Sequence, residues 1–207
     1  MKVAIINYGM GNLASVRRAL EDLGAEAYIA DHPAALYEAN RIVLPGVGAF
    51  SQGMKSLVDS GWFDALHDVV DRQHKPLLGI CLGMQMLASA GEEGGPTRGL
   101  GFIPGKVSRL DTLGCGLRLP HVGWNDVSFK SHDALLGRIP DGSDFYFVHS
   151  YALVPERPEY VLATTGYGCE LAAVVRNQNI FGCQFHPEKS SKAGRELLRN
   201  FLSYIPC

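Results

Sequence analysis

The sequence lacks long hydrophobic runs and has no excess of basic residues. No apolar stretch among its 207 residues approaches the length of a membrane span, and the one at the N-terminus is too short for a signal peptide. A formal net charge of -2 provides no basic stripe for nucleic acid. We therefore expect a cytoplasmic protein that binds neither a membrane nor nucleic acid.

Cysteine is scarce and irregularly spaced. The five cysteines are odd in number and form no C-x-x-C pair, which argues against a disulfide framework and against a structural zinc site. We therefore expect reduced thiols and no bound metal. The cysteines are Cys81, Cys115, Cys169, Cys183 and Cys207.

The first half of the chain alternates between strand and helix patterns. Strand-helix-strand units on short connections imply an α/β fold with a mostly parallel central sheet and helices on both faces. Apolar residues, 46% of the chain, suffice for a sizeable core. The predicted strands cover residues 2–7, 27–30, 41–44 and 76–80, and helical spacing of apolar residues marks 13–23 and 62–70.

From about Gly101 onward the pattern becomes β-rich. The turn Asn177-Gln178-Asn179 predicts a hairpin, and a last amphipathic helix carries apolar residues from Leu197 to Ile205. No internal repeat or linker interrupts the sequence, so we expect one domain over residues 1–207. The candidate strands of this half are 106–110, 145–153, 161–166, 171–176 and 180–185.

Cys81 is the most informative residue. It follows an apolar run that predicts a strand, opens a helical stretch, and lies between two glycines in the pattern Gly79-x-Cys81-x-Gly83. This is the pattern of a nucleophile elbow, with sulfur in place of the serine hydroxyl. A helix N-terminus favours the reactive thiolate. A buried cysteine is more often an inert small hydrophobe, so a partner base is needed.

His186 and Glu188 supply that base and its acid. Residues two apart in an extended segment point to the same face, so the two side chains can meet on either side of Pro187. The carboxylate would orient the imidazole, and the imidazole would take the proton of Cys81. The sequence thus predicts a Cys-His-acid triad.

A glycine-rich loop offers stabilisation of the oxyanion. Attack by Cys81 needs two donors, one of them the backbone N–H of Leu82. The second is predicted from Gly46, Val47 or Gly48, although the same residues could form an ordinary turn.

A competing pattern follows the first predicted strand. Gly9-x-Gly11-x-x-Ala14, with Asp31 about twenty residues further on, has the shape of a dinucleotide-binding fingerprint and would indicate a nicotinamide-dependent oxidoreductase. The same loop can be a tight strand-to-helix turn. A catalytically silent α/β binding module is the third alternative.

The segments Gly79 to Gln85 and Phe185 to Glu188, with the Pro45 to Gly48 loop, resemble the class I glutamine amidotransferases over the whole chain. The resemblance is strongest to the glutaminase subunits of histidine biosynthesis. It rests on the segments Asn7 to Asn12, Pro120 to Asn125, Tyr146 to Tyr151 and Lys189.

This resemblance implies hydrolysis of glutamine to glutamate and ammonia by Cys81, His186 and Glu188, without a cofactor. It implies that Gln85 binds the substrate and that the main chain of Ser150 and Tyr151 holds the α-carboxylate. Glu93 matches a position that contacts glutamine, although the adjacent Glu92 leaves that assignment open.

The resemblance also implies a partner. A cyclase subunit with a (βα)8 barrel would form a heterodimer with the chain and receive the ammonia. The docking surface would include Asn12, Trp124, Asn125 and Lys189. Similar glutaminase subunits serve the modification of surface-polysaccharide sugars, and the triad alone does not separate the two pathways.

Overall fold

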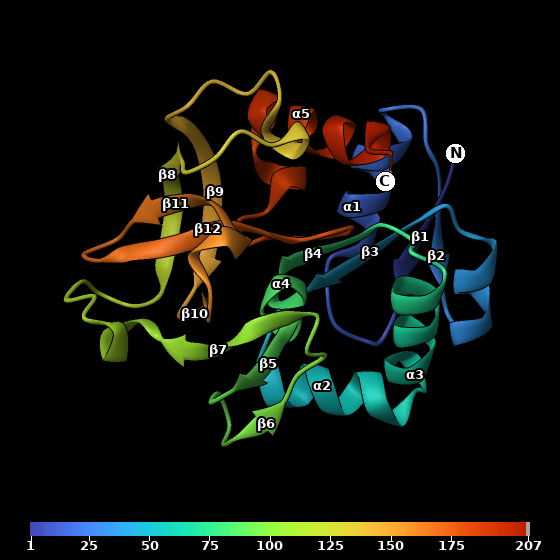
Figure 1. The fold of residues 1–207 in the computed structure, drawn as a ribbon, viewed down its shortest axis with the longest axis horizontal. Helices are drawn as coiled ribbons and strands as arrows, with labels where there is room; N and C mark the ends of the chain where they lie inside the picture. The colour runs from blue at the N-terminus through green and yellow to red at the C-terminus, as the bar shows by residue number, and fades with distance from the viewer. Residues whose placement is uncertain (206–207) are drawn as a thin grey trace.

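A nine-stranded sheet forms the centre of the computed structural model, which describes residues 1–205 (Figure 1). Five neighbouring strands are parallel, and the remaining four continue the sheet with antiparallel pairings. The predicted α/β class is confirmed. The order is β2 (Glu26–Ala30), β1 (Lys2–Ile6), β3 (Arg41–Gly46), β4 (Leu77–Cys81), β13 (Ile180–Cys183), β12 (Glu170–Asn177), β11 (Val161–Gly166), β8 (His121–Phe129) and β9 (Ser143–His149).

One strand of the C-terminal half completes the parallel part of the sheet. β13 pairs in parallel with β4, with Cys183 opposite Ile80. The ends of both strands therefore meet at one edge of the sheet, and the chain that follows β13 lies beside Cys81. The predicted hairpin before β13 is confirmed, because Asn177 pairs with Ile180 across the turn.

A smaller sheet lies below the central one in Figure 1. It mixes parallel and antiparallel pairs, and its strand β10 follows β9 with only Ser150 between them. Its strands, in order, are β10 (Tyr151–Pro155), β7 (Ile103–Arg109), β5 (Ala88–Gly91) and β6 (Thr97–Arg98).

Helices cover both faces of the central sheet (Figure 1). α1 (Leu13–Glu21) and α5 (Ser191–Ser203) pack on one face, where Val16, Leu20 and Leu197 join one apolar core cluster. α2 (Phe50–Asp59), α3 (Trp62–His67) and α4 (Leu82–Met86) pack on the other face with a second cluster. A π-helical turn (Asp68–Arg72) continues α3, and short 3-10 turns cover 33–38, 110–113, 134–136, 158–160 and 187–189.

Two predicted elements were wrong in extent. The strand predicted over residues 145–153 is two strands, β9 and β10, which belong to different sheets because the chain changes direction at Ser150. The last helix ends at Ser203, and Ile205 lies beyond it with 80% of its surface exposed. β8 was not predicted at all.

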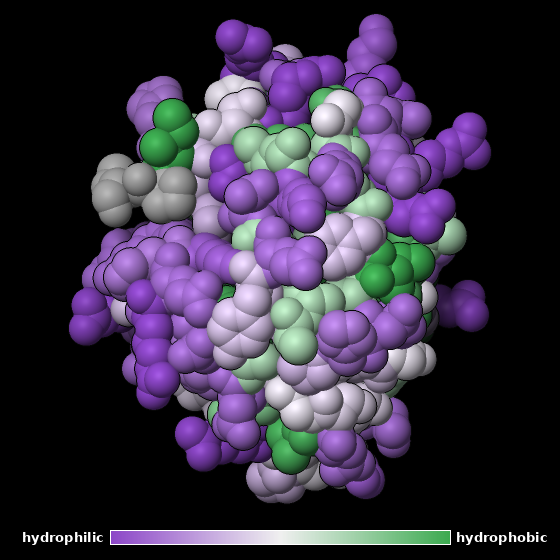
Figure 2. Space-filling view, turned by 90° about the vertical axis from the view of Figure 1, so that its right-hand side faces the viewer, coloured by the Kyte–Doolittle hydropathy of each residue, from purple (hydrophilic) through white to green (hydrophobic). Residues whose placement is uncertain are grey.

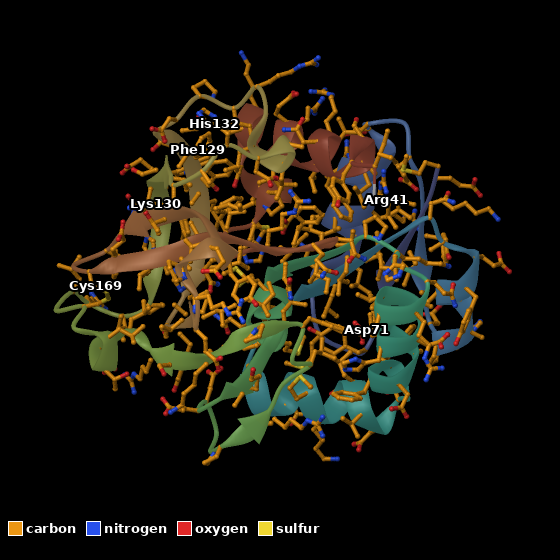
Figure 3. The ribbon with its side chains drawn as sticks, in the orientation of Figure 1. Arg41, Asp71, Phe129, Lys130, His132 and Cys169 are labelled. Atoms are coloured by element: carbon orange, nitrogen blue, oxygen red, sulfur yellow. A yellow bond between two sulfur atoms is a disulfide. The ribbon has the colours of Figure 1, made fainter. Side chains whose placement is uncertain are left out.

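Cys115 and Cys169 form a disulfide, so the prediction of reduced thiols is wrong for this pair. Their Cα atoms lie 5.0 Å apart across a sequence separation of 54, because the loop after β7 packs against the turn between β11 and β12. Figure 3 places Cys169 at the outer end of this region. Cys81 and Cys183 are free and buried, and Cys207 lies outside the described residues.

The surface over the first strands is mainly hydrophilic. Figure 2 shows hydrophobic side chains scattered among hydrophilic ones on this face. Arg41, labelled in Figure 3, points from β3 toward the end of α5 and donates a hydrogen bond to the carbonyl of Leu202. Within residues 1–205, no helix is both long and apolar enough to pass through a membrane.

Candidate active site

Cys81 lies at a sharp turn between β4 and α4. Its φ angle of 54° falls in the left-handed region, which is costly for a residue with a side chain. The flanking glycines permit the turn. A Cβ at Gly79 would lie 2.7 Å from the backbone of Gly83, and one at Gly83 would lie 1.7 Å from the carbonyl oxygen of Leu44. The geometry is that of the predicted nucleophile elbow.

His186 and Glu188 are paired behind the elbow. Nδ1 of His186 lies 2.8 Å from Oε1 of Glu188, and both side chains are buried, 3% and 1% exposed. The prediction of an extended segment here is wrong, because Pro187–Lys189 forms a 3-10 turn. The turn still brings the two side chains together.

The neighbours of His186 raise the pKa of its imidazole. Burial alone would lower its pKa, but the side chains of Cys81 and Glu188 beside it raise the pKa to about 9. Nε2 has no hydrogen-bond partner among the described residues. This nitrogen is therefore the one that can exchange a proton with the thiol.

The Cys81 sulfur opens into a cavity of about 400 Å³. A volume of this size holds a small polar molecule. The sulfur also lies 3.7 Å from the carbonyl oxygen of Val148. The lining consists of Val47, Gly48, Ala49, Cys81, Leu82, Gln85, Glu93, Pro120, Val148, His149, Ser150 and Tyr151.

The predicted oxyanion loop borders this cavity. Gly46 ends β3 directly opposite Cys81, and Val47 and Gly48 line the cavity wall together with Leu82, the first residue of α4. Gly48 has a φ angle of 119°, which favours glycine. Val47 is 43% exposed, so its side chain is only partly packed against the protein.

Gln85 and Tyr151 are joined by their polar groups. The Gln85 amide nitrogen donates to the carbonyl of Tyr151 over 2.8 Å and to Oε1 of Gln184 over 3.0 Å. Both of its hydrogens are thus used within the protein, and Oε1 of Gln85 remains to face a ligand. Ser150 lies next to Tyr151 on the same wall.

The structure separates Glu93 from Glu92. Glu93 lines the cavity, and its Oε2 accepts a hydrogen bond from the backbone N–H of Phe50 at the start of α2. Glu92 forms an ion pair with Lys106 away from the cavity. Of the two, Glu93 is the residue that lines the cavity.

Three of the four residues predicted for docking are exposed, and Asn125 is half-buried. Trp124 is 53% exposed and meets the ring of Tyr146 edge-on, and the Lys189 ammonium lies 5.8 Å from the centre of that ring. Asn12 is exposed and caps α1, which packs against the turn carrying Lys189. Asn125 differs, since its amide points inward to His121 and Gly166.

The glycines after β1 have a packing role. Gly11 has a φ angle of 133° and lies against the backbone of Gly46 beneath the oxyanion loop. Asp31 accepts a hydrogen bond from the side chain of Asn7 over 2.7 Å. Ala14 is exposed on α1. These contacts indicate that the glycine motif after β1 is a tight strand-to-helix turn.

Sequence reasoning missed three polar residues at this site. Gln184 is fully buried, and its Nε2 lies 3.7 Å from the Cys81 sulfur. His121 and His149 are buried and hydrogen bonded to each other over 2.9 Å. Gln184 stands two positions before His186, and this proximity was its one signal. His121 and His149 lie in two segments that carry the resemblance, but their meeting depends on the pairing of β8 with β9.

Comparisons with known proteins agree on one family. The model of the class-I glutamine amidotransferases matches residues 4–204. A protein of Moorella thermoacetica named imidazole glycerol phosphate synthase subunit HisH is 50% identical over 199 residues, which cover 96% of this chain and 93% of the relative. A protein of the same name from Symbiobacterium thermophilum is 47% identical, covering 97% and 92%.

Solved structures share the fold. The crystal structure of a glutamine amidotransferase superposes with a TM-score of 0.75 at 22% identity, covering 96% of each chain. A glutamine amidotransferase from Thermotoga maritima gives a TM-score of 0.71 at 18% identity, covering 98% of this chain and 96% of that one.

Proposed function

The chain belongs to the class I glutamine amidotransferases, and on that premise we propose that it hydrolyses L-glutamine to glutamate and ammonia. The observation that carries this proposal is a strained thiol, Cys81, beside a buried His186–Glu188 pair at the wall of one small cavity. We treat residues 1–207 as a single glutaminase domain.

The first half of the reaction forms a thioester. The Cys81 thiolate attacks the side-chain carbonyl carbon of glutamine, and the negative charge moves to the carbonyl oxygen. When the carbon–nitrogen bond breaks, Nε2 of His186 gives its proton to the departing nitrogen, and ammonia leaves. A raised pKa keeps His186 protonated for this step.

The second half restores the enzyme. Nε2 of His186, now neutral, takes a proton from water, and the oxygen attacks the thioester carbonyl. The carbon–sulfur bond breaks, glutamate leaves, and the thiolate and imidazolium are regenerated. Glu188 holds Nδ1 throughout and stabilises the imidazolium.

The oxyanion would be held by the N–H of Leu82 and by an N–H of the Gly46 to Gly48 loop. Exposure of Val47 and the glycines on both sides of it leave room for this peptide to reorient. We propose that a loaded partner drives the reorientation, so the isolated chain should be a weak glutaminase.

The polar groups left free in the cavity match the ends of glutamine. The carbonyl of Tyr151 already accepts from Gln85 and from His149, so only the N–H groups of Ser150 and Tyr151 remain for an α-carboxylate. Oε1 of Gln85 and the free oxygen of Glu93 are acceptors suited to the α-ammonium group.

The relatives are named as subunits of imidazole glycerol phosphate synthase, and we propose the same assembly here. The partner would be a cyclase subunit with a (βα)8 barrel, docked over the surface that carries Asn12, Trp124, Asn125 and Lys189. It would use the ammonia to make imidazole glycerol phosphate and aminoimidazole carboxamide ribotide in histidine biosynthesis. A cytoplasmic location fits this role.

The test is a two-part assay of the purified chain with a co-purified cyclase subunit. Glutamate release that is lost on Cys81→Ala would support the glutaminase, and imidazole glycerol phosphate formed with glutamine as nitrogen donor would support the pathway. Glutamate without imidazole glycerol phosphate would instead indicate another acceptor, such as a polysaccharide sugar. A Cys81→Ala protein with undiminished activity would end the proposal.

A further inference from the structure

Gln184 lies between the nucleophile and the substrate-binding side of the cavity. The residue follows β13 and is fully buried. Its backbone N–H is bonded to the carbonyl of Ala173 over 2.9 Å, which fixes the start of the side chain. The side-chain amide then reaches Gln85 with one atom and Cys81 with the other.

The direction of this amide follows from the hydrogen bonds. The carbonyl of Tyr151 can only accept, so the group of Gln85 that faces it, at 2.8 Å, must be the NH₂. The second hydrogen of that NH₂ meets Gln184 at 3.0 Å, which must therefore present Oε1. The NH₂ of Gln184 is left facing the sulfur of Cys81, 3.7 Å away.

A donor at this point favours the charged form of the sulfur. The Cys81 thiol can donate to the carbonyl of Val148, but a thiolate has no proton to donate and needs N–H groups in place of that carbonyl. Nε2 of His186 has no hydrogen-bond partner among the described residues. Gln184 holds a side-chain N–H 3.7 Å from the sulfur, within hydrogen-bond distance.

The other ionisable groups near the sulfur add no positive charge that would hold a thiolate. Burial raises the pKa values of Tyr8 and Cys183, so both groups stay neutral, and the side chain of Glu188 lies behind His186. A buried thiolate is therefore costly without further donors. A neutral donor held rigidly in place offsets part of this cost.

We propose that Gln184 is a further catalytic residue, whose side-chain N–H donates to the Cys81 sulfur and stabilises the thiolate that attacks glutamine. This role rests on the proposed glutaminase function, in which the thiolate is the nucleophile. It also leaves His186 free to carry the proton to the leaving ammonia.

The test is the rate at which iodoacetamide alkylates Cys81 in the full chain, followed by mass spectrometry of the Cys81 peptide across a range of pH. Gln184→Met keeps the size of the side chain and removes the donor, whereas Gln184→Glu keeps the acceptor for Gln85 and places a carboxylate at the sulfur. We expect alkylation near neutral pH to fall about tenfold to a hundredfold in both, and its pH profile to move to higher pH.

Glutaminase activity should fall together with the alkylation rate of Cys81. In Gln184→Glu, kcat should decrease by a similar factor with KM little changed, because Gln85 keeps its partner. Gln52→Met, an exposed residue of α2, is the matched control and should leave both measurements unchanged. Cys81→Ala gives the background from other thiols.

The outcomes separate this role from the glutaminase proposal, because alkylation requires no glutamine. Unchanged alkylation of Cys81 in correctly folded Gln184→Met and Gln184→Glu would overturn the role of Gln184 even if the parent hydrolyses glutamine. If both variants unfold, the alkylation rate of Gln85→Leu tests the role of Gln184. This substitution removes the hydrogen bond that holds Oε1 of Gln184, so the NH₂ of Gln184 is no longer directed at the sulfur. Slower alkylation there supports the role, and an unchanged rate refutes it.

Discussion

Nδ1 of His121 lies 2.9 Å from Nε2 of His149, and the direction of this hydrogen bond is fixed by the groups at its two ends. His149 uses Nδ1 to reach the carbonyl of Tyr151, so Nδ1 carries its proton and Nε2 accepts. His121 must therefore donate from Nδ1 and accept on Nε2, where the Asn125 amide lies at 3.2 Å. A chain of hydrogen bonds thus runs from the docking surface to the cavity wall.

Removing His149 should weaken glutamine binding. In His149→Leu the carbonyl of Tyr151 loses one of its two donors, and the N–H groups proposed to hold the α-carboxylate lose a support. We expect KM for glutamine to rise about tenfold with kcat reduced less than threefold, as for the loss of roughly one buried hydrogen bond. Steady-state kinetics of glutamate release measure both constants.

His132→Leu is the control for that measurement. His132 is exposed and lies far from α4 (Figure 3), so neither constant should change. A fall in kcat alone for His149→Leu, with KM unaltered, would contradict the positioning role.

The histidines also predict how stability depends on pH. Burial lowers the pKa values of His121 and His149 to about 4, below the ordinary 6.5, so the unfolded state binds more protons between these values. Stability should therefore decline as the pH falls from 6.5 toward 4. His186 affects stability in the opposite direction, because its pKa is raised to about 9. Its contribution to the free energy of unfolding is complete below pH 6.5 and is lost as the pH rises toward 9.

Urea unfolding at about pH 4.5, 6.5 and 9 tests this dependence. The free energy of unfolding should be greatest near 6.5, and His186→Gln should remove on the order of 2 kcal/mol of the decline toward pH 9. His121→Gln should leave that alkaline limb intact and flatten the acid one. If the free energies of unfolding of the parent and His186→Gln differed by the same amount at all three pH values, the raised pKa of His186 would be disproved.

The members of the triad should differ in their effects. His186→Ala removes the proton carrier and should lower kcat by on the order of 10⁴-fold or more, close to the loss on Cys81→Ala. Glu188→Gln should be milder, on the order of 10²-fold, because orientation and charge are lost and the imidazole stays. The initial rate of glutamate release ranks the variants, and a Glu188→Gln protein as inactive as His186→Ala would contradict this order.

Local motifs were sufficient to predict the elbow and the His–Glu pair, because each depends on residues within a few positions of one another. The meeting of Cys81 with His186 depends on β13 pairing with β4, which the predicted hairpin before β13 made possible but did not require. The triad stays a prediction about chemistry, and the pairing of β13 with β4 brings the segment that carries His186 beside Cys81.

Other features carry no local signal. The direction change at Ser150 contains neither glycine nor proline, so the alternating residues on both sides resemble one strand. β8 includes Gly123 and several polar residues, and it is a strand because it pairs with β9. The Cys115–Cys169 disulfide depends on two loops meeting, which spacing along the chain does not reveal.

Gly83 should be essential for the elbow. A Cβ at this position would lie 1.7 Å from the carbonyl oxygen of Leu44, and backbone on both sides prevents an easy shift. We expect Gly83→Ala to lower the free energy of unfolding by about 3 kcal/mol, measured by urea unfolding. At Gly116 a Cβ would meet no atom within 4 Å, so Gly116→Ala should change stability by less than about 0.5 kcal/mol. If Gly83→Ala and Gly116→Ala were equally stable, the backbone at the elbow could shift to accommodate a Cβ.

Trp124 should be an energetic centre of the docking surface. Its ring is 53% exposed and is supported edge-on by Tyr146, an arrangement that keeps a large apolar group at the surface in one orientation. Aromatic anchors of this kind dominate many interfaces. We expect Trp124→Ala to weaken binding of the cyclase subunit by about tenfold to a hundredfold, measured by calorimetric titration.

Tyr37→Ala is the matched control, because Tyr37 is equally exposed, at 50%, in the 3-10 turn after β2, outside the proposed docking surface. Its affinity for the cyclase should equal that of the parent. Since Trp124 does not line the cavity, glutamate release by the isolated chain should also stay unchanged. If Trp124→Ala and Tyr37→Ala bind the cyclase equally well, the partner docks elsewhere and the ammonia must leave by a path that avoids this face.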